Sequence, residues 1–583
     1  MADLVPESVR RKVIKAAPDS LWRVMGPVVH GTTAPQQRLR RLRSRRVLSR
    51  VPKRIRGEAI PIAHGAHNWL AHPVQAFLST DVLAAHLDLV ADALEADGIH
   101  YVVIDAATNR RRLVAVSERD ADRARAALTK HLTDQGVYYA RVAGGRARRR
   151  GIIGHQTIPA NWDELRIFRA LATPGGVLLG GDELGCDLQF WRETDHDESP
   201  GPAGESMPAG TWVAPAPNRW FDMIQPDQRT TTDRAVDGTP RPMLASLTAP
   251  HAESVTFPID VVYTWVDGDD PDWRRRKAEA LKQASGLGRI NPLAQNPSRY
   301  TSRDELRYSM RSLDMYAGWV GHVYLVTDDQ VPTWLDTTHP KLTVVSHPEL
   351  FGPRGRLPTF NSHAIESQLH HIEGLAEHFL YLNDDVFFGR PVVPEQFVLS
   401  NGLSLFFLSA AKLSLGDPSP QDWPVMAAGK RNRALIDVRF GHQITNKLQH
   451  VSHSLRRSVL RDIEETFRAE HRDTAMAQFR SDRDIAIPSS LAHYYGYFTG
   501  RAVPGTIRYL YADIAMTDTP DRLASLLRRR NFDVFCLNDM DSSTVDPLHQ
   551  STMLRDFLES YFPLPSSFER RDDVDGLPAA GPG

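Results

Sequence analysis

The sequence predicts an α/β protein, in which a mostly parallel sheet in the C-terminal half follows a smaller α+β module. After residue 257, apolar β-branched runs alternate with amphipathic helices, which is typical of parallel strands joined by right-handed crossovers. The 583 residues are 41% hydrophobic and 24% charged, with a net charge of -1, an ordinary globular composition. This composition, with only Cys186 and Cys536 as cysteines, excludes wholesale disorder, collagen and a disulfide scaffold.

Composition and pattern divide the chain into five parts. They are a basic arm over 1–60, a small α+β accessory module over 61–160, a strand-rich and Pro/Gly-rich connecting region over 161–250, the main α/β domain over 251–570 and a flexible tail over 571–583. The module is predicted from amphipathic helices at 82–94 and 119–133 and short apolar strands at 100–104, 112–116 and 137–142. Residues 196–250 are rich in Pro, Gly, Thr and Asp, as connecting or covering segments are.

The basic arm predicts an anionic partner. From Arg38 to Arg56 it carries many basic residues and no acidic one. Nucleic acid is not the expected partner, because no aromatic residue is interleaved to stack on bases. An anionic membrane surface or a polyanionic polymer would satisfy the same charges, and a merely solvated tail is the alternative.

The location expected from the sequence is cytoplasmic, with peripheral contact at the inner face of the membrane through the arm. The longest apolar stretches, such as 404–411, are far shorter than the roughly 20 residues of a membrane helix. Charged residues at Lys15, Asp19 and Arg23 interrupt the N-terminal segment, so no secretory apolar region forms.

The main domain begins with a buried strand that ends in acidic residues. The apolar run after Pro258 leads into a turn that holds Asp267, Asp269 and Asp270. Ligands of open α/β sheets bind at the carboxyl edge, so this turn is a candidate for a nucleotide or a metal-bound diphosphate. The same Asp-Gly-Asp pattern is also common turn chemistry.

A helix over 303–313 and strands at 322–327 and 341–346 follow, and the helix predicted next covers 360–372. The strand 379–382 then ends in Asp384 and Asp385. Magnesium takes oxygen ligands from one or two carboxylates and completes its shell with substrate phosphates, so this corner is a candidate metal site, unless its acids merely cap the next element. A last strand, 533–537, is followed by Asn538 and Asp539, which could complete the site or only cap a turn.

Five blocks of the main domain resemble the signature regions of the Stealth family. They are Ile259–Gly268, Glu305–Ser309, Leu357–Phe360 with Ala364–Ser367, Tyr381–Val386 and Phe535–Asp539. The family includes bacterial capsule and exopolysaccharide hexose-1-phosphate transferases and the animal N-acetylglucosamine-1-phosphotransferase. The resemblance covers roughly residues 257–570. It implies a GT-A-like domain that uses Mg²⁺ or Mn²⁺ to transfer a hexose-1-phosphate from a UDP-sugar to a glycan hydroxyl, with release of UMP.

The resemblance also implies roles for individual residues. The matching positions are Glu366, Asp384 and Asp385 in the catalytic cluster, and His453 and Arg480 in the region of the family's sugar and phosphate contacts. We expect both aspartates to bind the metal and Glu366 to act as general base. His453, as a further catalytic residue, and Arg480 are expected to hold the transferred sugar phosphate. Asp267, Asn538 and Asp539 are expected on the substrate side. Either His450 or His453 could fill the family's histidine position. His453 is favoured because a helix predicted over 454–467 places it at a helix N-terminus, where a phosphate is stabilised.

Two other functions compete with sugar-phosphate transfer. A metal-dependent glycosyltransferase would use the same acidic corners but attack the anomeric carbon and release UDP. A polyanion-binding protein would act through its arginine-rich arm, with an inactive α/β domain and a steep dependence on salt.

Overall fold

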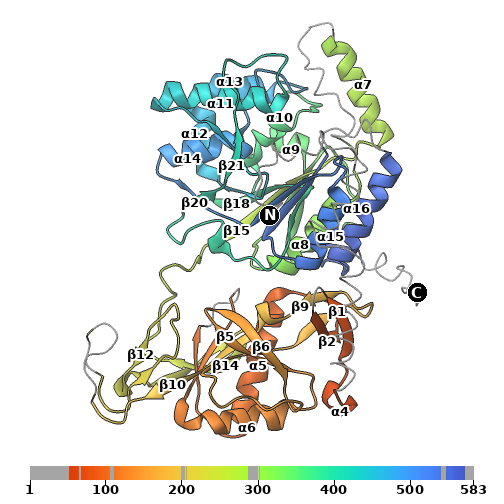
Figure 1. The fold of residues 1–583 in the computed structure, drawn as a ribbon. Coiled ribbons are helices and arrows are strands. Elements are labelled where there is room, and N and C mark those ends of the chain that lie inside the picture. Colours follow the sequence, from red (N-terminus) through yellow and green to blue (C-terminus); the bar gives the residue numbers. More distant parts are fainter. Residues whose placement is uncertain are drawn as a thin grey trace. The chain divides into compact units, whose positions relative to one another are not determined.

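The computed structural model describes residues 51–64, 67–105, 110–197, 204, 207–285, 300, 302–539 and 546–570. These residues form two compact units, an N-terminal unit over 51–252 and a C-terminal unit over 253–570 (Figure 1). Most of the basic arm and the whole C-terminal tail lie outside the described residues. Each unit has a hydrophobic core of its own.

A large mixed sheet is the centre of the N-terminal unit. Its strands run in the order β13-β14-β3-β4-β10-β7-β5-β6, and β11 with β12 extends from β10. The bounds are β3 (Val102–Asp105), β4 (Leu113–Ser117), β5 (Tyr138–Ala143), β6 (Arg146–Ile152), β7 (Glu164–Phe168), β10 (Cys186–Glu193), β11 (Trp212–Val213), β12 (Met223–Ile224), β13 (Thr231–Val236) and β14 (Thr239–Leu244). Helices α5 (Ser79–Ala96) and α6 (Ala121–Leu132) share one apolar core with β4, β7 and β10. The helices and strands predicted within 82–142 are therefore confirmed, with slightly shifted ends.

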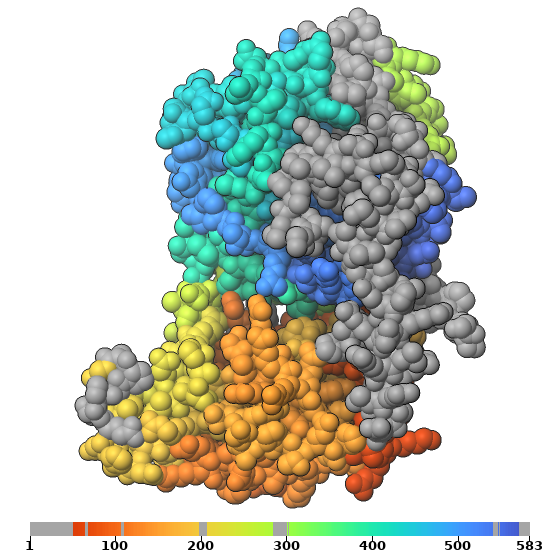
Figure 2. Space-filling model, viewed as in Figure 1, coloured from red at the N-terminus to blue at the C-terminus, as the bar shows by residue number. Residues whose placement is uncertain are grey.

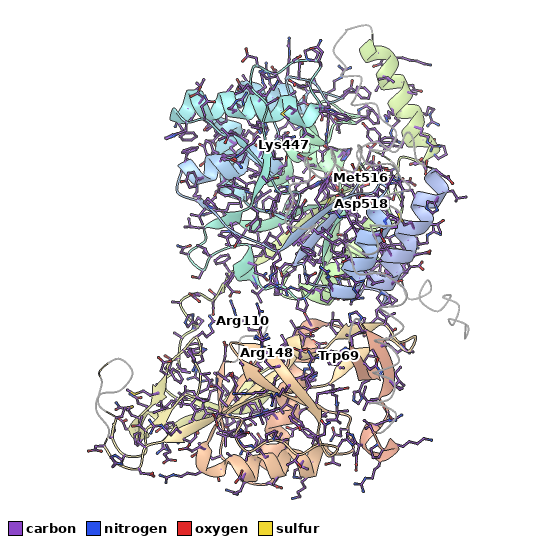
Figure 3. The ribbon with its side chains drawn as sticks, in the orientation of Figure 1. Trp69, Arg110, Arg148, Lys447, Met516 and Asp518 are labelled. Atoms are coloured by element: carbon purple, nitrogen blue, oxygen red, sulfur yellow. The ribbon has the colours of Figure 1, made fainter. Side chains whose placement is uncertain are left out.

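A second, smaller sheet of this unit has the order β1-β2-β8-β9. Its strands are β1 (Ile60–His64), β2 (His67–Pro73), β8 (Ala170–Ala172) and β9 (Leu178–Gly180), and the short helix α4 (Lys53–Arg56) precedes them. Trp69 on β2 is labelled in Figure 3. It joins this sheet to the large one, because its ring contacts Tyr138 and Phe168 edge-on at centroid distances of 5.7 and 6.2 Å.

Residues 212–244 lie within the region predicted to connect or cover, but they form strands β11 to β14. The chain here is anchored by Arg241 on β14, whose guanidinium contacts Asp88, Asp92 and Glu95 of α5 at 2.6, 2.8 and 2.9 Å. The polar composition of this segment therefore did not predict a strand, although its buried arginine forms ion pairs with acids of α5.

A mostly parallel sheet is the centre of the C-terminal unit, as predicted. Its order is β17-β16-β15-β18-β23. The strands are β15 (Ile259–Thr264), β16 (Val323–Thr327), β17 (Leu342–Ser346), β18 (His378–Asn383) and β23 (His453–Arg456). Strands β15 to β18 are parallel, and β23 alone among them is antiparallel, pairing with β18. The near-continuous apolar strands fit a sheet that is covered on both faces.

A small sheet of order β19-β26-β25 continues the C-terminal unit. Its strands are β19 (Val386–Phe388), β25 (Tyr509–Asp513) and β26 (Val534–Asn538). Further pairs are β20 (Ser404–Phe406) with β24 (Ala502–Pro504), and β21 (Leu408–Lys412) with β22 (Asn446–Leu448). Because β19 follows β18 after two residues, the chain passes directly from the parallel sheet into the small one.

Helices flank these strands in two groups. The first group is α9 (His347–Phe351), α10 (Ser362–Glu366), α11 (Pro424–Phe440), α12 (Arg457–Thr466), α13 (Arg468–Ala475) and α14 (Ala492–Phe498). The second is α7 (Pro271–Ser285), α8 (Glu305–Tyr316), α15 (Thr519–Arg529) and α16 (Pro547–Tyr561). Figure 1 shows α11 to α14 together beside the parallel sheet, and in the space-filling view they form the outer surface of the unit there (Figure 2).

Two predicted helices are shorter in the structure. The helix predicted over 360–372 is the single turn α10 followed by a separate 3₁₀ turn, η7 (Leu369–His371). Asn361 caps α10 by accepting a hydrogen bond from the His363 amide at 3.1 Å. The helix predicted over 454–467 begins only at Arg457, because the residues before it form β23.

Within the described part of the chain, no helix combines the length and the apolar character that crossing a bilayer requires.

Candidate active site

Asp384 and Asp385 form the turn at which the chain leaves the parallel sheet and enters the small sheet. Strand β18 ends at Asn383 and β19 begins at Val386, so the turn consists of these two acidic residues. The end of β26 reaches the same place, because the Leu537 amide donates to the Asp385 carbonyl oxygen at 3.0 Å. The acidic corner therefore lies where strands of two sheets end, which is where α/β sheets bind their ligands.

The Asp385 carboxylate is held at one oxygen. Its Oδ2 accepts hydrogen bonds from Asn538 Nδ2 at 2.9 Å and from the Cys536 thiol at 3.5 Å. Its Oδ1 lies 3.8 Å from His450 Nε2 and is buried without a hydrogen-bond partner among the described residues. A buried carboxylate oxygen without a partner carries a desolvation cost that a bound cation would offset.

Asp384 lies in a cluster of like charges. Burial raises the pKa of its carboxyl well above the ordinary value, and the neighbouring Glu305 and Asp385 carboxylates raise it further. Glu305 is the first residue of α8, and burial raises the pKa of its side chain as well. Three carboxylates gathered in a partly buried corner repel one another, so the corner favours a cation.

The donors at this corner suit a hard divalent cation. Burial and the Asp385 carboxylate raise the pKa of Cys536 well above its ordinary value, so without a metal the thiol is protonated and donates to Asp385 Oδ2. The oxygen donors are the carboxylates of Asp384 and Asp385, a set that leaves room for water and for substrate phosphates around Mg²⁺ or Mn²⁺. The residues present therefore fit the metal that the resemblance implies.

Glu366 is a buried carboxylate at the end of α10. Its Oε1 accepts a hydrogen bond from the Tyr381 hydroxyl at 3.2 Å, and that hydroxyl also contacts Thr264 Oγ1 at 2.9 Å. Its Oε2 is buried and has no hydrogen-bond partner among the described residues. Glu366 is thus oriented by β18 and presents one oxygen that can accept a proton.

Arg480 lies at the opposite end of α10. Its Nη2 donates to Ser362 Oγ, whereas its Nη1 is buried without a hydrogen-bond partner in the described part of the chain. The neighbouring Asp484 holds this segment in place, because its buried carboxylate accepts from Asn361 Nδ2 at 2.9 Å and lies 3.3 Å from His363 Nδ1. A guanidinium with an unused donor suits an anionic oxygen of a substrate.

His453 does not stand at a helix N-terminus, so the reason given for favouring it was wrong. It is the first residue of β23, paired with Tyr381 across the sheet, and its Nδ1 lies 3.2 Å from His493 Nε2. Burial lowers the pKa of His453 well below its ordinary value, so its imidazole is neutral. His450 is the histidine at the acidic corner, with Nε2 3.1 Å from Asn383 Oδ1.

Two other predicted residues have partners of their own. The Asp267 carboxylate accepts from the Asp269 amide at 2.8 Å, a contact within its own turn. Asp539 follows β26 and pairs with Arg303 Nη2 at 2.8 Å.

Sequence reasoning gave no chemical role to Glu305, Cys536 or Tyr381, although all three lie inside the quoted blocks; Glu305 was expected only as part of a capping box with Ser302. Glu305 carried the available signal, because it is an acid that opens an amphipathic helix within one of the quoted blocks.

Comparisons with known proteins identify the family to which the chain is similar. Four conserved regions described for Stealth proteins match the chain: region 1 at residues 257–285, region 2 at 299–406, region 3 at 449–497 and region 4 at 524–576. Region 2 contains the acidic corner and Glu366, region 3 contains His450 and Arg480, and region 4 contains Asn538.

The chain is 42% identical to a protein of Streptomyces coelicolor named exopolysaccharide phosphotransferase, over 98% of this chain and 96% of the relative. It is 38% identical to the exopolysaccharide phosphotransferase CpsY of Mycobacterium tuberculosis, over 70% of this chain and 73% of that relative. Among solved structures, the galactosyltransferase LgtC with donor and acceptor sugar analogues matches at 12% identity and a TM-score of 0.29, covering 55% of this chain and 100% of that one. We assign the α/β fold from the strand order of this chain and not from the match to LgtC. By its four conserved regions and by its relatives, the chain belongs to the Stealth family.

Proposed function

We propose that the chain is an exopolysaccharide phosphotransferase that moves a hexose-1-phosphate or N-acetylhexosamine-1-phosphate from a UDP-sugar to a glycan hydroxyl. The observation that carries the proposal is a set of three buried polar atoms without hydrogen-bond partners among the described residues: Asp385 Oδ1, Glu366 Oε2 and Arg480 Nη1. The reaction requires three groups: an oxygen that binds the metal, an acceptor for the proton of the attacking hydroxyl, and an N–H that donates a hydrogen bond to a phosphate oxygen. The names of the relatives support the same activity.

The proposed reaction is an in-line displacement at the sugar-bearing phosphorus. The acceptor oxygen forms a bond to this phosphorus, the bond from phosphorus to the bridging oxygen breaks, and UMP leaves with that oxygen. The acceptor proton passes to Glu366 Oε2. A divalent ion held by Asp384 and Asp385 would neutralise charge on the diphosphate.

The remaining residues position the groups that react. Arg480 directs its unused Nη1 to a phosphate oxygen of the sugar phosphate. His453 is neutral and buried beside Tyr381, so it would contribute a hydrogen bond to the transferred group without adding charge. Asn538 fixes the Asp385 carboxylate, so that Oδ1 keeps its direction toward the ligand.

Two basic segments would bind the acceptor glycan or an anionic surface. The N-terminal unit contributes Arg146, Arg148 and Arg149 on β6, the strand at the end of the large sheet, and all three are exposed. Figure 3 labels Arg148 on this strand. The basic arm that precedes the unit carries the same charge, and both segments suit a polyanionic polymer or a membrane surface.

The nucleotide released tests the proposal. The purified chain is incubated with Mg²⁺ or Mn²⁺, a panel of UDP-sugars and a glycan acceptor. UMP together with a phosphodiester signal in phosphorus NMR is expected. Release of UDP would replace the proposal by glycosyl transfer. No nucleotide product across the panel, together with polyanion binding that is lost on deletion of residues 1–50, would favour the polyanion-binding alternative.

A further inference from the structure

A second group of side chains that could bind a metal lies in the C-terminal unit. It shares no residue with the site proposed for sugar-phosphate transfer. His370 and His371 on η7 both contact Glu464 on α12, with their Nε2 atoms 2.6 and 3.0 Å from Glu464 Oε2. His471 on α13 places its Nδ1 3.9 Å from Glu464 Oε1. Two separate elements, η7 and α13, therefore bring imidazole nitrogens close to one carboxylate of a third element, α12.

The hydrogen bond of His471 fixes which of its nitrogens carries the proton. Its Nε2 lies 2.9 Å from the Ser367 carbonyl oxygen, which only accepts, so Nε2 must be the donor. In the neutral imidazole, Nδ1 then directs a lone pair toward the Glu464 carboxylate. Two acceptors that face each other repel unless a cation lies between them. A histidine whose other nitrogen donates to a backbone carbonyl is also the usual arrangement of a metal ligand.

We propose that His370, His371 and Glu464 bind a zinc ion, with His471 Nδ1 as the nearest fourth donor. The donor atoms of the first three lie within 4.8 Å of one another. Ligands about 2.0 to 2.2 Å from a tetrahedral zinc lie about 3.3 Å apart, so the contacts of 2.6 and 3.0 Å need to widen by about 0.7 and about 0.3 Å. Imidazole-rich sites of this kind suit zinc, unlike the carboxylate corner at Asp384 and Asp385.

The zinc would be structural. Ser367, whose carbonyl orients His471, directly follows Glu366, and η7 begins two residues later. An ion bound here would hold η7, α12 and α13 together. Because α10 lies just before η7 in the chain, the ion would also restrain the segment that carries Glu366. The zinc site does not depend on the reaction proposed above, because its residues and its experiment are separate.

Metal content and stability test the site directly. The full chain, freed of any histidine tag, is dialysed against a chelator, loaded with zinc and washed, and its zinc is measured by mass spectrometry. We expect one zinc ion per chain and a rise in Tm on loading, because a ligand that binds only the folded state stabilises it. Cobalt in place of zinc should give visible absorption bands of a tetrahedral site.

Variants locate the ion. Glu464→Gln should weaken zinc binding by at least about 100-fold, since losing even an outer-shell partner costs about 10- to 100-fold. Glu465→Gln removes the exposed neighbouring carboxylate and should bind zinc as the unchanged chain does. Asp385→Asn should also keep its zinc, which separates this site from the Asp385, His450 and Cys536 cluster.

Two outcomes would overturn the proposal: a chain that retains no zinc and shows no change in Tm, or zinc that is retained at full affinity by Glu464→Gln. If Glu464→Gln does not fold, His371→Ala, which alters a partly exposed side chain, replaces it with the same expected loss.

Discussion

The Tyr381 hydroxyl donates a hydrogen bond to Glu366 Oε1 at 3.2 Å, and this contact links the proposed general base to the strand that carries the acidic corner. Tyr381 lies on β18, three residues before Asp384. Burial and the Glu366 carboxylate both raise the pKa of Tyr381 well above its ordinary value, so the hydroxyl stays protonated and remains a donor. The base and the metal corner are therefore held in a fixed relation by one strand.

Replacing Glu366 by Gln should reduce kcat by about 100- to 10,000-fold, the usual contribution of general base catalysis. Binding of the UDP-sugar should change little, because the amide keeps the hydrogen bond to Tyr381. Rates of UMP release and calorimetric titration with the donor measure the two effects. Glu373→Gln, an exposed acid of the same segment, is the matched control. Substantial turnover in Glu366→Gln would remove Glu366 from the role of base.

Removing divalent metal should abolish transfer, and Mg²⁺ or Mn²⁺ should restore it. Asp385→Asn should require far more metal for half-maximal rate, because Oδ1 loses its charge at the corner. Rates measured across a metal titration give the comparison. Asp329→Asn is the control, since Asp329 is exposed with a φ of 57°, a conformation that Asn tolerates. Equal metal requirements in the two variants would argue against Asp385 as a ligand.

Arg480→Lys should weaken donor binding by roughly 10- to 100-fold, as expected when a charged hydrogen bond worth about 1.5 to 3 kcal/mol is lost. The lysine retains the charge but cannot contact Ser362 and a phosphate oxygen with one planar group. Donor titrations compare it with Arg483→Lys, which changes an exposed arginine three residues away. If Arg483→Lys has the larger effect, the phosphate contact belongs to Arg483.

The N-terminal unit should lose stability as the pH falls from 6.5 toward 4, because of His86. This buried imidazole donates from Nδ1 to the Leu184 carbonyl oxygen at 2.8 Å and accepts at Nε2 from the Arg169 amide at 2.9 Å. Burial lowers its pKa from 6.5 to about 4, so the unfolded chain binds the extra proton in this window and the folded chain does not. Stability is complete above pH 6.5 and declines by about 1.4 kcal/mol per pH unit, about 3 kcal/mol in all.

Hydrogen exchange of the α5 amides between pH 4 and 7, corrected for the intrinsic rate, measures this loss. His86→Gln should flatten the pH dependence, because its amide does not titrate. His100→Gln, which alters an exposed histidine, should retain the slope of the unchanged chain. The same slope in His86→Gln would assign the effect to another group.

Much of the site could be predicted from local pattern. Asp384 and Asp385 follow a continuous apolar run, and such a run forms a buried strand wherever it is placed in the sheet, so its acidic end marks a sheet edge. Arg241 shows the limit of this reasoning. Its segment has the composition of a loop, but it forms a strand that pairs with β13 and β3. Three acids of α5, about 150 positions earlier, bind its guanidinium.

The sequence by itself determined the alternation of strands and helices in the C-terminal unit and the acidic corner after β18, because apolar periodicity and strand ends depend on near neighbours in the chain. Only the tertiary structure decided that His453 is in a strand, that His450, Cys536 and Asn538 surround Asp385, and that Tyr381 orients Glu366. Each of these contacts joins residues that are distant in sequence or lie on different elements. Their meeting depends on strand register and sheet packing, which are set by the burial of the whole unit and not by any local pattern.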